Sequence, residues 1–341
     1  MKKRLLGKNP AELKQIALDA GLPGFAGGQM AQWLYQKRVR TIDEMTNLSK
    51  QGREALKQDY EVGRTAPLDV QTSADGTRKY LFPVGGDAAN AIEAVMIPDA
   101  DRKTLCVSSQ AGCKMGCKFC MTGRQGFHGQ LETADILNQF FSIEEAGELT
   151  NTVFMGMGEP LDNWENVKSA IDILTAPWGL AWSPKRITLS TIGVLPNLKR
   201  YLEESRCHLA VSLHNPFPEE RAQLMPVQKA WSLTEIVRLI KQYDFTGQRR
   251  VSFEYTVFDG WNNTPRHAAE LVKLLRNLEC RVNLIRFHRI PDFPYGPAPD
   301  KAMEAFRDRL VQGGLTATIR ASRGEDIYAA CGLLAGKHNA L

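Results

Sequence analysis

The sequence predicts an α/β protein in which a small helical N-terminal domain precedes a parallel sheet built from strand–helix units. Two observations support this class. From residue 104 onward, short β-branched and apolar runs alternate with longer stretches of helical period, which is typical of a parallel sheet with right-handed crossovers. Before that point the apolar spacing is helical, and 341 residues suffice for two domains or for a barrel with an appendage.

Residues 1–65 are expected to form a helical accessory domain. Pro10 after Asn9 is typical of a helix start, and Gly21 follows the end of that helical pattern. A second helix is expected over about 27–37, and a third after Asn47.

The positive charge of the chain is concentrated in this first domain. The net charge is +5, and residues 1–65 hold 12 Lys and Arg against 7 Asp and Glu, whereas the remaining residues hold 31 of each. A basic domain suits the phosphate backbone of a nucleic acid. The charge alone leaves a solvated helical face as an equal alternative.

Residues 66–100 change to strand period and are expected to connect the two main parts. Short strands are expected at 78–82 and 91–96, around turns at Asp75-Gly76 and Gly85-Gly86. Residues 101–341 form the main domain. Its expected strands are 104–109, 152–156, 186–190, 208–213, 251–257 and 281–287, with a further edge strand at 315–320. Helices are expected at about 132–146, 163–175, 195–205, 232–243 and 264–278.

Unusual residues gather at the carboxyl ends of these strands. A loop with three cysteines follows the first strand, and Gly156-Met-Gly-Glu-Pro160 ends the second. The third, fourth and sixth strands end in Ser190, Ser212-Leu-His214 and His288. Each has an ordinary alternative as a turn residue, a strand-end cap or a satisfied polar group. Because carboxyl ends of barrel strands carry active sites, their coincidence on one face predicts a site there.

The three cysteines are Cys113, Cys117 and Cys120, and their spacing predicts an iron–sulfur site. Thiolates are soft ligands, and three of them can hold three irons of a 4Fe-4S cluster. The fourth iron is then open to S-adenosylmethionine (SAM), whose reductive cleavage gives a 5′-deoxyadenosyl radical. The alternatives are a zinc site completed by His128 and a chance run of buried cysteines.

Several motifs carry a family resemblance. They are the loop Gln110–Gly123, Gly156–Pro160, Ser212–His214, Asp326–Gly332 and, in the first domain, Gly21–Phe25, Gln32–Tyr35 and Ile42–Ser49. With them the chain resembles the radical SAM RNA adenine methyltransferase family that includes RlmN and Cfr. The resemblance implies a partial (β/α)6 barrel, one 4Fe-4S cluster, SAM, and methylation of an adenosine carbon in 23S rRNA, possibly also in tRNA.

The resemblance also implies a division of labour among site residues. Cys331 takes a methyl group from one SAM, and a second SAM supplies the radical that activates this group for addition to adenine, whose carbon 2 is too electron-poor to attack a sulfonium methyl. Cys106 then attacks the Cys331 sulfur and releases the product, and Glu93 accepts a proton. The implied cofactor-binding residues are Gly158, Glu159, Ser190, Ser212, Leu213, His214 and His288.

Three positions depart from the family pattern, and they concern the substrate nucleotide. His288 stands where Asn is usual, Tyr328 replaces a small polar or acidic residue, and Leu333 replaces Gln. Methylation at carbon 2 is expected, with carbon 8 as the alternative. A noncatalytic, metal-containing RNA-binding protein is the alternative from another class.

The remaining expectations concern compartment and partners. The basic start of the chain contains only Leu5 and Leu6 as an apolar stretch, which is too short for export, and no membrane span is evident. Seven cysteines, three of them expected as metal ligands, favour a reducing compartment, so a cytoplasmic location is expected. The protein is also expected to be a monomer. Cys207 and Cys280 are interpreted as small apolar residues. Radical chemistry requires an electron donor such as flavodoxin or ferredoxin.

Overall fold

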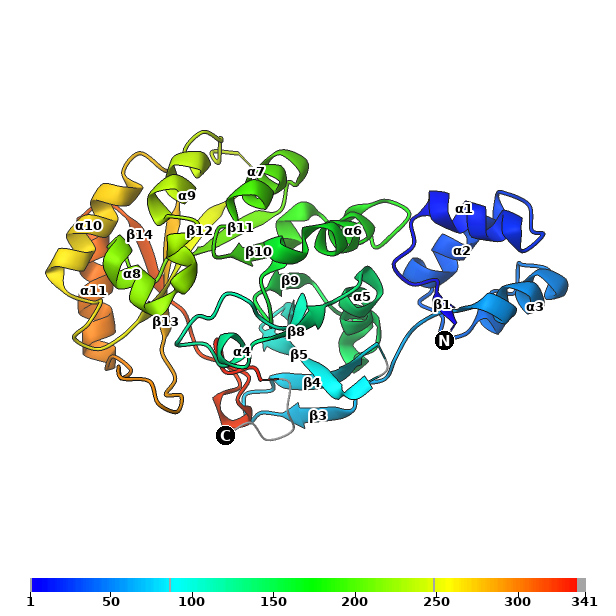
Figure 1. Ribbon diagram of the computed structural model, residues 1–341, viewed down its shortest axis with the longest axis horizontal. Helices are drawn as coiled ribbons and strands as arrows, with labels where there is room; N and C mark the ends of the chain where they lie inside the picture. Colours follow the sequence, from blue (N-terminus) through cyan, green and yellow to red (C-terminus); the bar gives the residue numbers. More distant parts are fainter. Residues whose placement is uncertain (1, 86, 248, 336–341) are drawn as a thin grey trace.

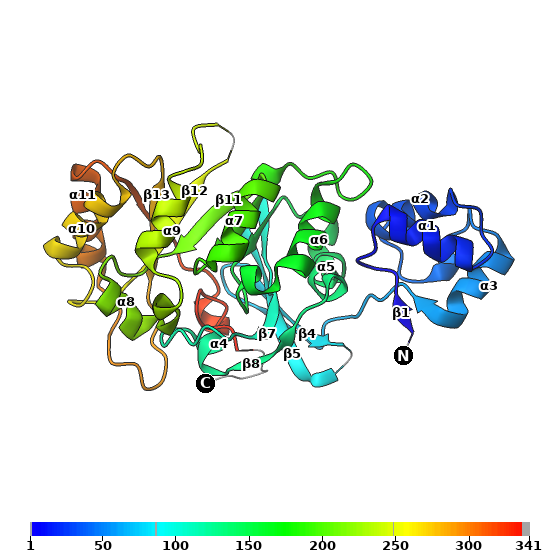
Figure 2. The same cartoon turned by 45° about the horizontal axis from the view of Figure 1, so that its top comes forward.

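A computed structural model describes residues 2–85, 87–247 and 249–335 of the chain. Within these ranges the main sheet has ten strands in the order β14-β13-β12-β11-β10-β9-β6-β5-β4-β3. Helices cover its outer face, and a separate helical body lies beside α5 and α6 (Figures 1 and 2). None of the helices in the described ranges is long and apolar enough to cross a membrane.

Seven parallel strands form the main part of this sheet and confirm the predicted partial barrel. They are β6 (Arg102–Cys106), β9 (Asn151–Phe154), β10 (Ile187–Thr191), β11 (His208–Ser212), β12 (Val251–Val257), β13 (Arg281–Arg286) and β14 (Thr316–Ile319). The connecting helices include α5 (Thr133–Phe141), α6 (Trp164–Thr175), α7 (Leu195–Glu204), α9 (Leu233–Ile240) and α10 (Pro265–Leu275), all close to the predicted ranges. Among the described residues, three α-helices of this part were not predicted, α4 (Met121–Arg124), α8 (Pro218–Leu224) and α11 (Asp300–Gln312).

Residues 69–99 extend this sheet instead of forming a loose connection. They contain three antiparallel strands, β3 (Asp69–Thr72), β4 (Arg78–Val84) and β5 (Asp87–Asp99), where two short strands were predicted. β5 is long because it pairs with β4 on one side and with β6 on the other, where Val95 lies opposite Cys106. The predicted turn at Asp75-Gly76 joins β3 to β4, whereas Gly86 of the second turn lies outside the described residues.

The accessory domain has the three predicted helical segments. Asn9 caps α1 (Pro10–Asp19) by accepting from the N–H groups of Ala11 and Glu12. α2 (Ala26–Ala31) continues as a π-helical turn, η1 (Gln32–Gln36), and α3 (Lys50–Asp59) follows the cap Ser49. A short parallel pair, β1 (Lys3–Arg4) with β2 (Tyr60–Glu61), closes the domain and was not predicted.

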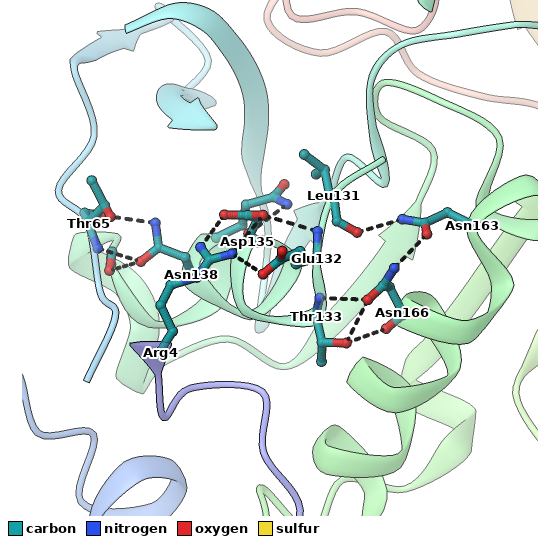
Figure 3. A network of polar contacts seen from close by, with 11 residues as sticks. Arg4, Thr65, Leu131, Glu132, Thr133, Asp135, Asn138, Asn163 and Asn166 are labelled. Atoms are coloured by element: carbon teal, nitrogen blue, oxygen red, sulfur yellow. Dashed lines mark hydrogen bonds and ion pairs between the residues drawn. The ribbon is translucent and has the colours of Figure 1, made fainter. Parts of the chain in front are cut away.

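Polar contacts join the accessory domain to the barrel (Figure 3). The Arg4 guanidinium binds the carboxylates of Glu132 and Asp135 at 2.6 and 2.5 Å, at the start of α5. Thr65 and Asn138 exchange two hydrogen bonds, each of 2.9 Å, between the Asn138 amide and the Thr65 backbone. The contacts of Arg4 with Asp135 and of Thr65 with Asn138 are partly buried, and the first is charge-assisted, so they hold the domain in one position more firmly than exposed ion pairs would.

Two further strands form a small hairpin over the barrel mouth. They are β7 (Gln110–Gly112) and β8 (Phe127–Gln130), and they enclose the cysteine loop and α4 (Met121–Arg124). This hairpin brings the loop back over the carboxyl ends of the parallel strands.

Candidate active site

A pocket lies at the carboxyl ends of the parallel strands, where the sequence predicted a site. Its wall contains the three cysteines of the loop and residues from the ends of β9, β10, β11 and β12. The predicted residues in the wall are Cys113, Cys117, Cys120, Gly158, Glu159, Ser190, Ser212, His214 and Cys331. The other predicted residues, Cys106, Glu93, Leu213 and His288, lie outside this lining as far as the described residues define it.

The cysteine loop presents three sulfurs to this pocket. Backbone N–H groups point at two of them, from Met115 to Cys113 and from Thr122 and Gly123 to Cys120. Burial raises the pKa of Cys113 to about 12 and also raises those of Cys117 and Cys120, so the free thiols hold their protons until a metal displaces them. N–H donors aimed at sulfur are the groups that stabilise cluster-bound thiolates, so the loop fits an iron–sulfur cluster.

The zinc alternative rests on His128, which is exposed on β8 and outside the pocket lining. Within the part of the chain that the structure describes, no three His, Cys, Asp or Glu side chains are arranged around a single metal-ion position.

The Gly156–Pro160 segment is held by hydrogen bonds to Glu159. Its carboxylate accepts from the Thr191 hydroxyl at 2.6 Å and from the Ile192 N–H at 2.9 Å, and burial raises its pKa to about 7. Gly158 has φ +96°, and a Cβ there would lie 2.5 Å from Gln110, so glycine is required for this close approach. The hydrogen bonds of Glu159 therefore hold this part of the pocket wall in place, and the absence of a side chain at Gly158 lets the backbone line the pocket.

A buried arginine supports the Ser212–His214 corner. Arg221 donates to the carbonyls of Ser212 and Leu213 at 3.0 and 3.1 Å and to Gln228 Oε1 at 2.6 Å. His214 Nδ1 accepts from the Thr256 N–H at 2.9 Å, and burial lowers its pKa to about 3, so its ring is neutral and carries its proton on Nε2. Arg221 also faces Cys117 and favours the ionised form of that sulfur.

Cys106 and Cys331 are brought together although the sequence separates them widely. Cys106 is the last residue of β6 and is buried, and Cys331 is exposed to the pocket; both are free thiols. Burial raises the pKa of Cys106 to about 12, and the neighbouring Cys331 raises it further. Burial also raises the pKa of Cys331, and the Arg320 guanidinium opposes this effect.

Glu93 lies on β5 behind the pocket and is almost completely buried. Its Oε1 is 3.0 Å from Lys79 Nζ, and its Oε2 accepts from the Ala335 N–H at 2.6 Å. The carboxylate therefore faces the segment that carries Cys331, four residues before Ala335.

The three departures from the family pattern lie close to this same segment. His288 Nε2 is 3.0 Å from the Ser322 hydroxyl, Tyr328 is 43% exposed with φ +53°, and Leu333 is buried. Both remaining cysteines were interpreted as buried apolar residues; Cys207 is buried in the core, whereas Cys280 is only partly buried against it.

Sequence reasoning missed three charged residues of the site. They are Arg221 behind Cys117, Glu254 in the pocket wall, and Arg320 beside Cys331. Glu254 stands inside a strand that is otherwise mostly apolar, Val251–Val257, and a charge in such a run was the available signal. Arg221 and Arg320 have no comparable signal, because their positions beside the cysteines depend on tertiary packing.

Comparisons with known proteins agree with this geometry. Residues 107–275 match the radical SAM superfamily, and residues 3–62 match the ribosomal RNA large subunit methyltransferase N-terminal domain. The structure is similar to that of a radical SAM methyltransferase from Sphaerobacter thermophilus, with a TM-score of 0.91 and 36% sequence identity over 98% of this chain and 99% of that chain. The fold and the cysteine loop thus define a radical SAM enzyme.

Relatives with assigned names identify the family within the radical SAM enzymes. A probable dual-specificity RNA methyltransferase RlmN from Porphyromonas gingivalis is 58% identical over 97% of this chain and 96% of its own length. The RlmN of Syntrophus aciditrophicus is 40% identical over 96% and 94%. The chain belongs to the RlmN family of radical SAM RNA methyltransferases.

Proposed function

We propose that the protein methylates carbon 2 of an adenosine in 23S rRNA, and also in tRNA, through an S-methylcysteine on Cys331. The observation that carries this proposal is the placement of two free thiols, Cys106 and Cys331, beside a pocket lined by three further cysteines. The relatives named as dual-specificity RNA methyltransferases support an RNA substrate of more than one kind.

Cys113, Cys117 and Cys120 would hold the 4Fe-4S cluster, and the wall formed by Gly158, Ser190, Ser212 and His214 would hold SAM. When bound, the cluster and SAM supply 5′-deoxyadenosyl radical chemistry. The neutral His214 would add no positive charge to a pocket that binds the cationic SAM, and the buried Glu159 keeps the backbone of its loop in place. Leu213 and His288 are the other proposed cofactor-binding residues, and Glu93 is the proposed base; all three lie outside the pocket lining.

Cys331 and Cys106 would divide the reaction between them. The Cys331 thiolate takes a methyl group from one SAM, and Arg320 favours that thiolate. A second SAM is consumed when a hydrogen atom leaves the S-methyl group and the resulting carbon bonds to adenine. One electron and one proton would then leave the base; the electron would return to the cluster, and Glu93 would accept the proton. The Cys106 thiolate attacks the Cys331 sulfur, a disulfide forms, the carbon–sulfur bond breaks, and a proton completes the new methyl group.

Glu93 lies close enough to the chain around Cys331 for this role, because its Oε2 accepts from the Ala335 N–H at 2.6 Å. The Lys79 ammonium lies 3.0 Å from Glu93 Oε1. We therefore assign Glu93 to the proton-transfer step.

The proposal includes the partners and the compartment. The substrate is folded RNA, the electron donor is a flavodoxin or ferredoxin, and the protein acts as a monomer in the cytoplasm. Seven free cysteines support a reducing compartment.

Nucleoside analysis tests the proposal directly. RNA treated with the protein, SAM and a reductant is digested and analysed by mass spectrometry against synthetic standards. The expected product is 2-methyladenosine. A product identified as 8-methyladenosine would move the reaction to carbon 8, and binding of RNA without either product or 5′-deoxyadenosine would favour a noncatalytic RNA-binding protein.

A further inference from the structure

The segment that carries Cys331 is fastened to the cluster loop by hydrogen bonds. The Met121 N–H donates to the Gly332 carbonyl at 2.8 Å, and the Thr122 hydroxyl donates to the Leu334 carbonyl at 2.7 Å. On the other side, the Ala335 N–H donates to Glu93. These contacts hold residues 332–335, which we call the carrier segment, from both sides.

Thr122 occupies a special place in this arrangement. It lies two residues after the proposed ligand Cys120, and its own N–H points at the Cys120 sulfur. Its side chain is almost completely buried, and its hydroxyl donates to the Leu334 carbonyl while also lying within hydrogen-bonding reach of the Cys120 sulfur. One residue therefore contacts both the expected cluster ligand and the carrier segment.

The carrier segment follows an unusual path and is held by apolar packing as well as by hydrogen bonds. Gly332 has φ +87°, and Tyr328, three residues before Cys331, also has positive φ. A chain that passes through two left-handed residues has to be held by contacts from its surroundings. Upstream, Asp326 binds the Ser73 hydroxyl at 2.6 Å. Downstream of Cys331, the side chains of Leu333 and Leu334 are buried in the core, and the hydrogen bonds come from Met121, Thr122 and Glu93.

We propose that Thr122 is a positioning residue for the carrier cysteine, and that its hydroxyl links the placement of Cys331 to the loop that holds the cluster. This inference rests on the proposed role of Cys331 as methyl carrier. Displacement of a reacting group by about 1 Å can lower a rate about 100-fold, so a short bond next to the carrier has a direct route to the reaction. Binding of the cluster would order the loop and, through Thr122, the carrier segment.

Substitutions at Thr122 separate positioning from folding. Thr122→Val keeps the shape of the side chain and removes the hydroxyl, whereas Thr122→Ser keeps the hydroxyl. Thr152→Val is the matched control, because the Thr152 hydroxyl is equally buried and donates to the Leu105 carbonyl at 2.8 Å, away from the carrier segment. Iron and sulfide content and thermal unfolding are measured for each variant.

Hydrogen exchange gives a readout that needs no catalysis. In the protein without cluster, exchange of the amides of residues 332–335 should be about 3- to 10-fold faster in Thr122→Val than in the wild type, the effect of one buried hydrogen bond. Thr122→Ser and Thr152→Val should resemble the wild type. Cluster reconstitution should slow exchange of these amides in the wild type and have a smaller effect in Thr122→Val.

Coupling of the reaction gives the second readout. Thr122→Val should still cleave SAM but should release about 3- to 10-fold more 5′-deoxyadenosine per methylated adenosine than the wild type, because the misplaced carrier intercepts fewer radicals. Equal exchange and an equal ratio in Thr122→Val and the wild type would overturn the inference. Mass spectrometry of the wild-type protein keeps the two proposals distinguishable. Lack of a methyl group on Cys331 refutes the carrier role, whatever the exchange data show at Thr122.

Discussion

Replacement of Arg221 by methionine should destabilise the Ser212–His214 corner and weaken SAM binding. Arg221 has three hydrogen bonds of 3.1 Å or shorter, to two carbonyls and to Gln228. Bonds to a charged donor contribute about 1.5–3 kcal/mol each, so their loss costs at least about 4.5 kcal/mol. Methionine carries no charge that has to be buried, and this gain offsets part of the cost of the lost hydrogen bonds. Burial lowers the Arg221 pKa from 12.5 to about 10, which corresponds to roughly 3 kcal/mol.

The net loss of unfolding free energy is therefore about 1–1.5 kcal/mol or more, and with an unfolding entropy of about 2.1 cal/mol/K per residue a chain of 341 residues should melt about 1.5–2 °C lower or more. Thermal unfolding followed by circular dichroism measures this fall, and equilibrium binding measures the affinity for SAM. Arg200→Met is the control, since Arg200 is 40% exposed and pairs with Glu165 and Glu204 at the surface. Arg221→Lys keeps the charge near Cys117 and should lose less. An unchanged melting temperature together with unchanged SAM affinity in Arg221→Met would refute this reasoning.

Further predictions concern the pH dependence, the cysteines and RNA. The pKa of His214 is about 3 in the folded state and 6.5 in the unfolded state, so His214 contributes stability above pH 6.5 that is lost as the pH falls toward 3, at up to about 1.4 kcal/mol per pH unit. In His214→Asn the free energy of unfolding, measured by urea unfolding at each pH, should therefore depend less steeply on pH in this window. An equal pH slope in the variant and the wild type would contradict the assignment. Ser in place of any of the three loop cysteines should abolish cluster absorbance and 5′-deoxyadenosine formation, and a soluble variant with full SAM cleavage would exclude that ligand. Cys331→Ala should give no product and no adduct, whereas Cys106→Ala should accumulate a covalent protein–RNA species on denaturing gels; normal turnover without Cys106 would reject its role. Gln at the exposed residues Lys14, Lys37 and Lys50 should reduce the salt slope of RNA binding by about 0.7–0.9 per lost phosphate contact, while Gln at Lys199, Lys273 and Lys301 serves as control; equal slopes would place the RNA elsewhere.

Local signals in the sequence predicted most of the fold. The start of α1 could be predicted because Asn9 and Pro10 act within one turn, and they do so in the structure. The parallel strands could be predicted because buried strands leave a continuous apolar pattern. The length of β5 could not, because its 13 residues are stabilised by partners on two sides that no local pattern specifies.

The candidate site likewise has parts that could be predicted from local sequence and parts that depend on tertiary contacts. The three cysteines and the Gly156–Pro160 segment could be found because each occupies a short stretch of sequence with its own chemical pattern. The contact of the Thr122 hydroxyl with the Leu334 carbonyl could not, because it joins residues 212 positions apart. Glu93 shows both sides of this limit. Its family position suggested a proton acceptor, whereas its contacts with Lys79 and Ala335 appear only in the folded chain.

The accessory domain and the pocket are joined by a continuous polar route, which matters for an enzyme that acts on large RNA. Arg4 binds the start of α5, Thr133 at that same point contacts Asn166, and Asn166 donates to Asn163. Asn163 in turn donates to the carbonyls of Ser109 and Leu131, which flank the hairpin around the cysteine loop. A base that leaves its stack loses a few kcal/mol, which contacts elsewhere on the RNA have to offset. If the basic domain contacts the RNA backbone, as its charge suggests, these contacts require a fixed distance between that domain and the pocket. The route in Figure 3 provides that fixed distance, because it connects the basic domain to the backbone beside the cluster loop.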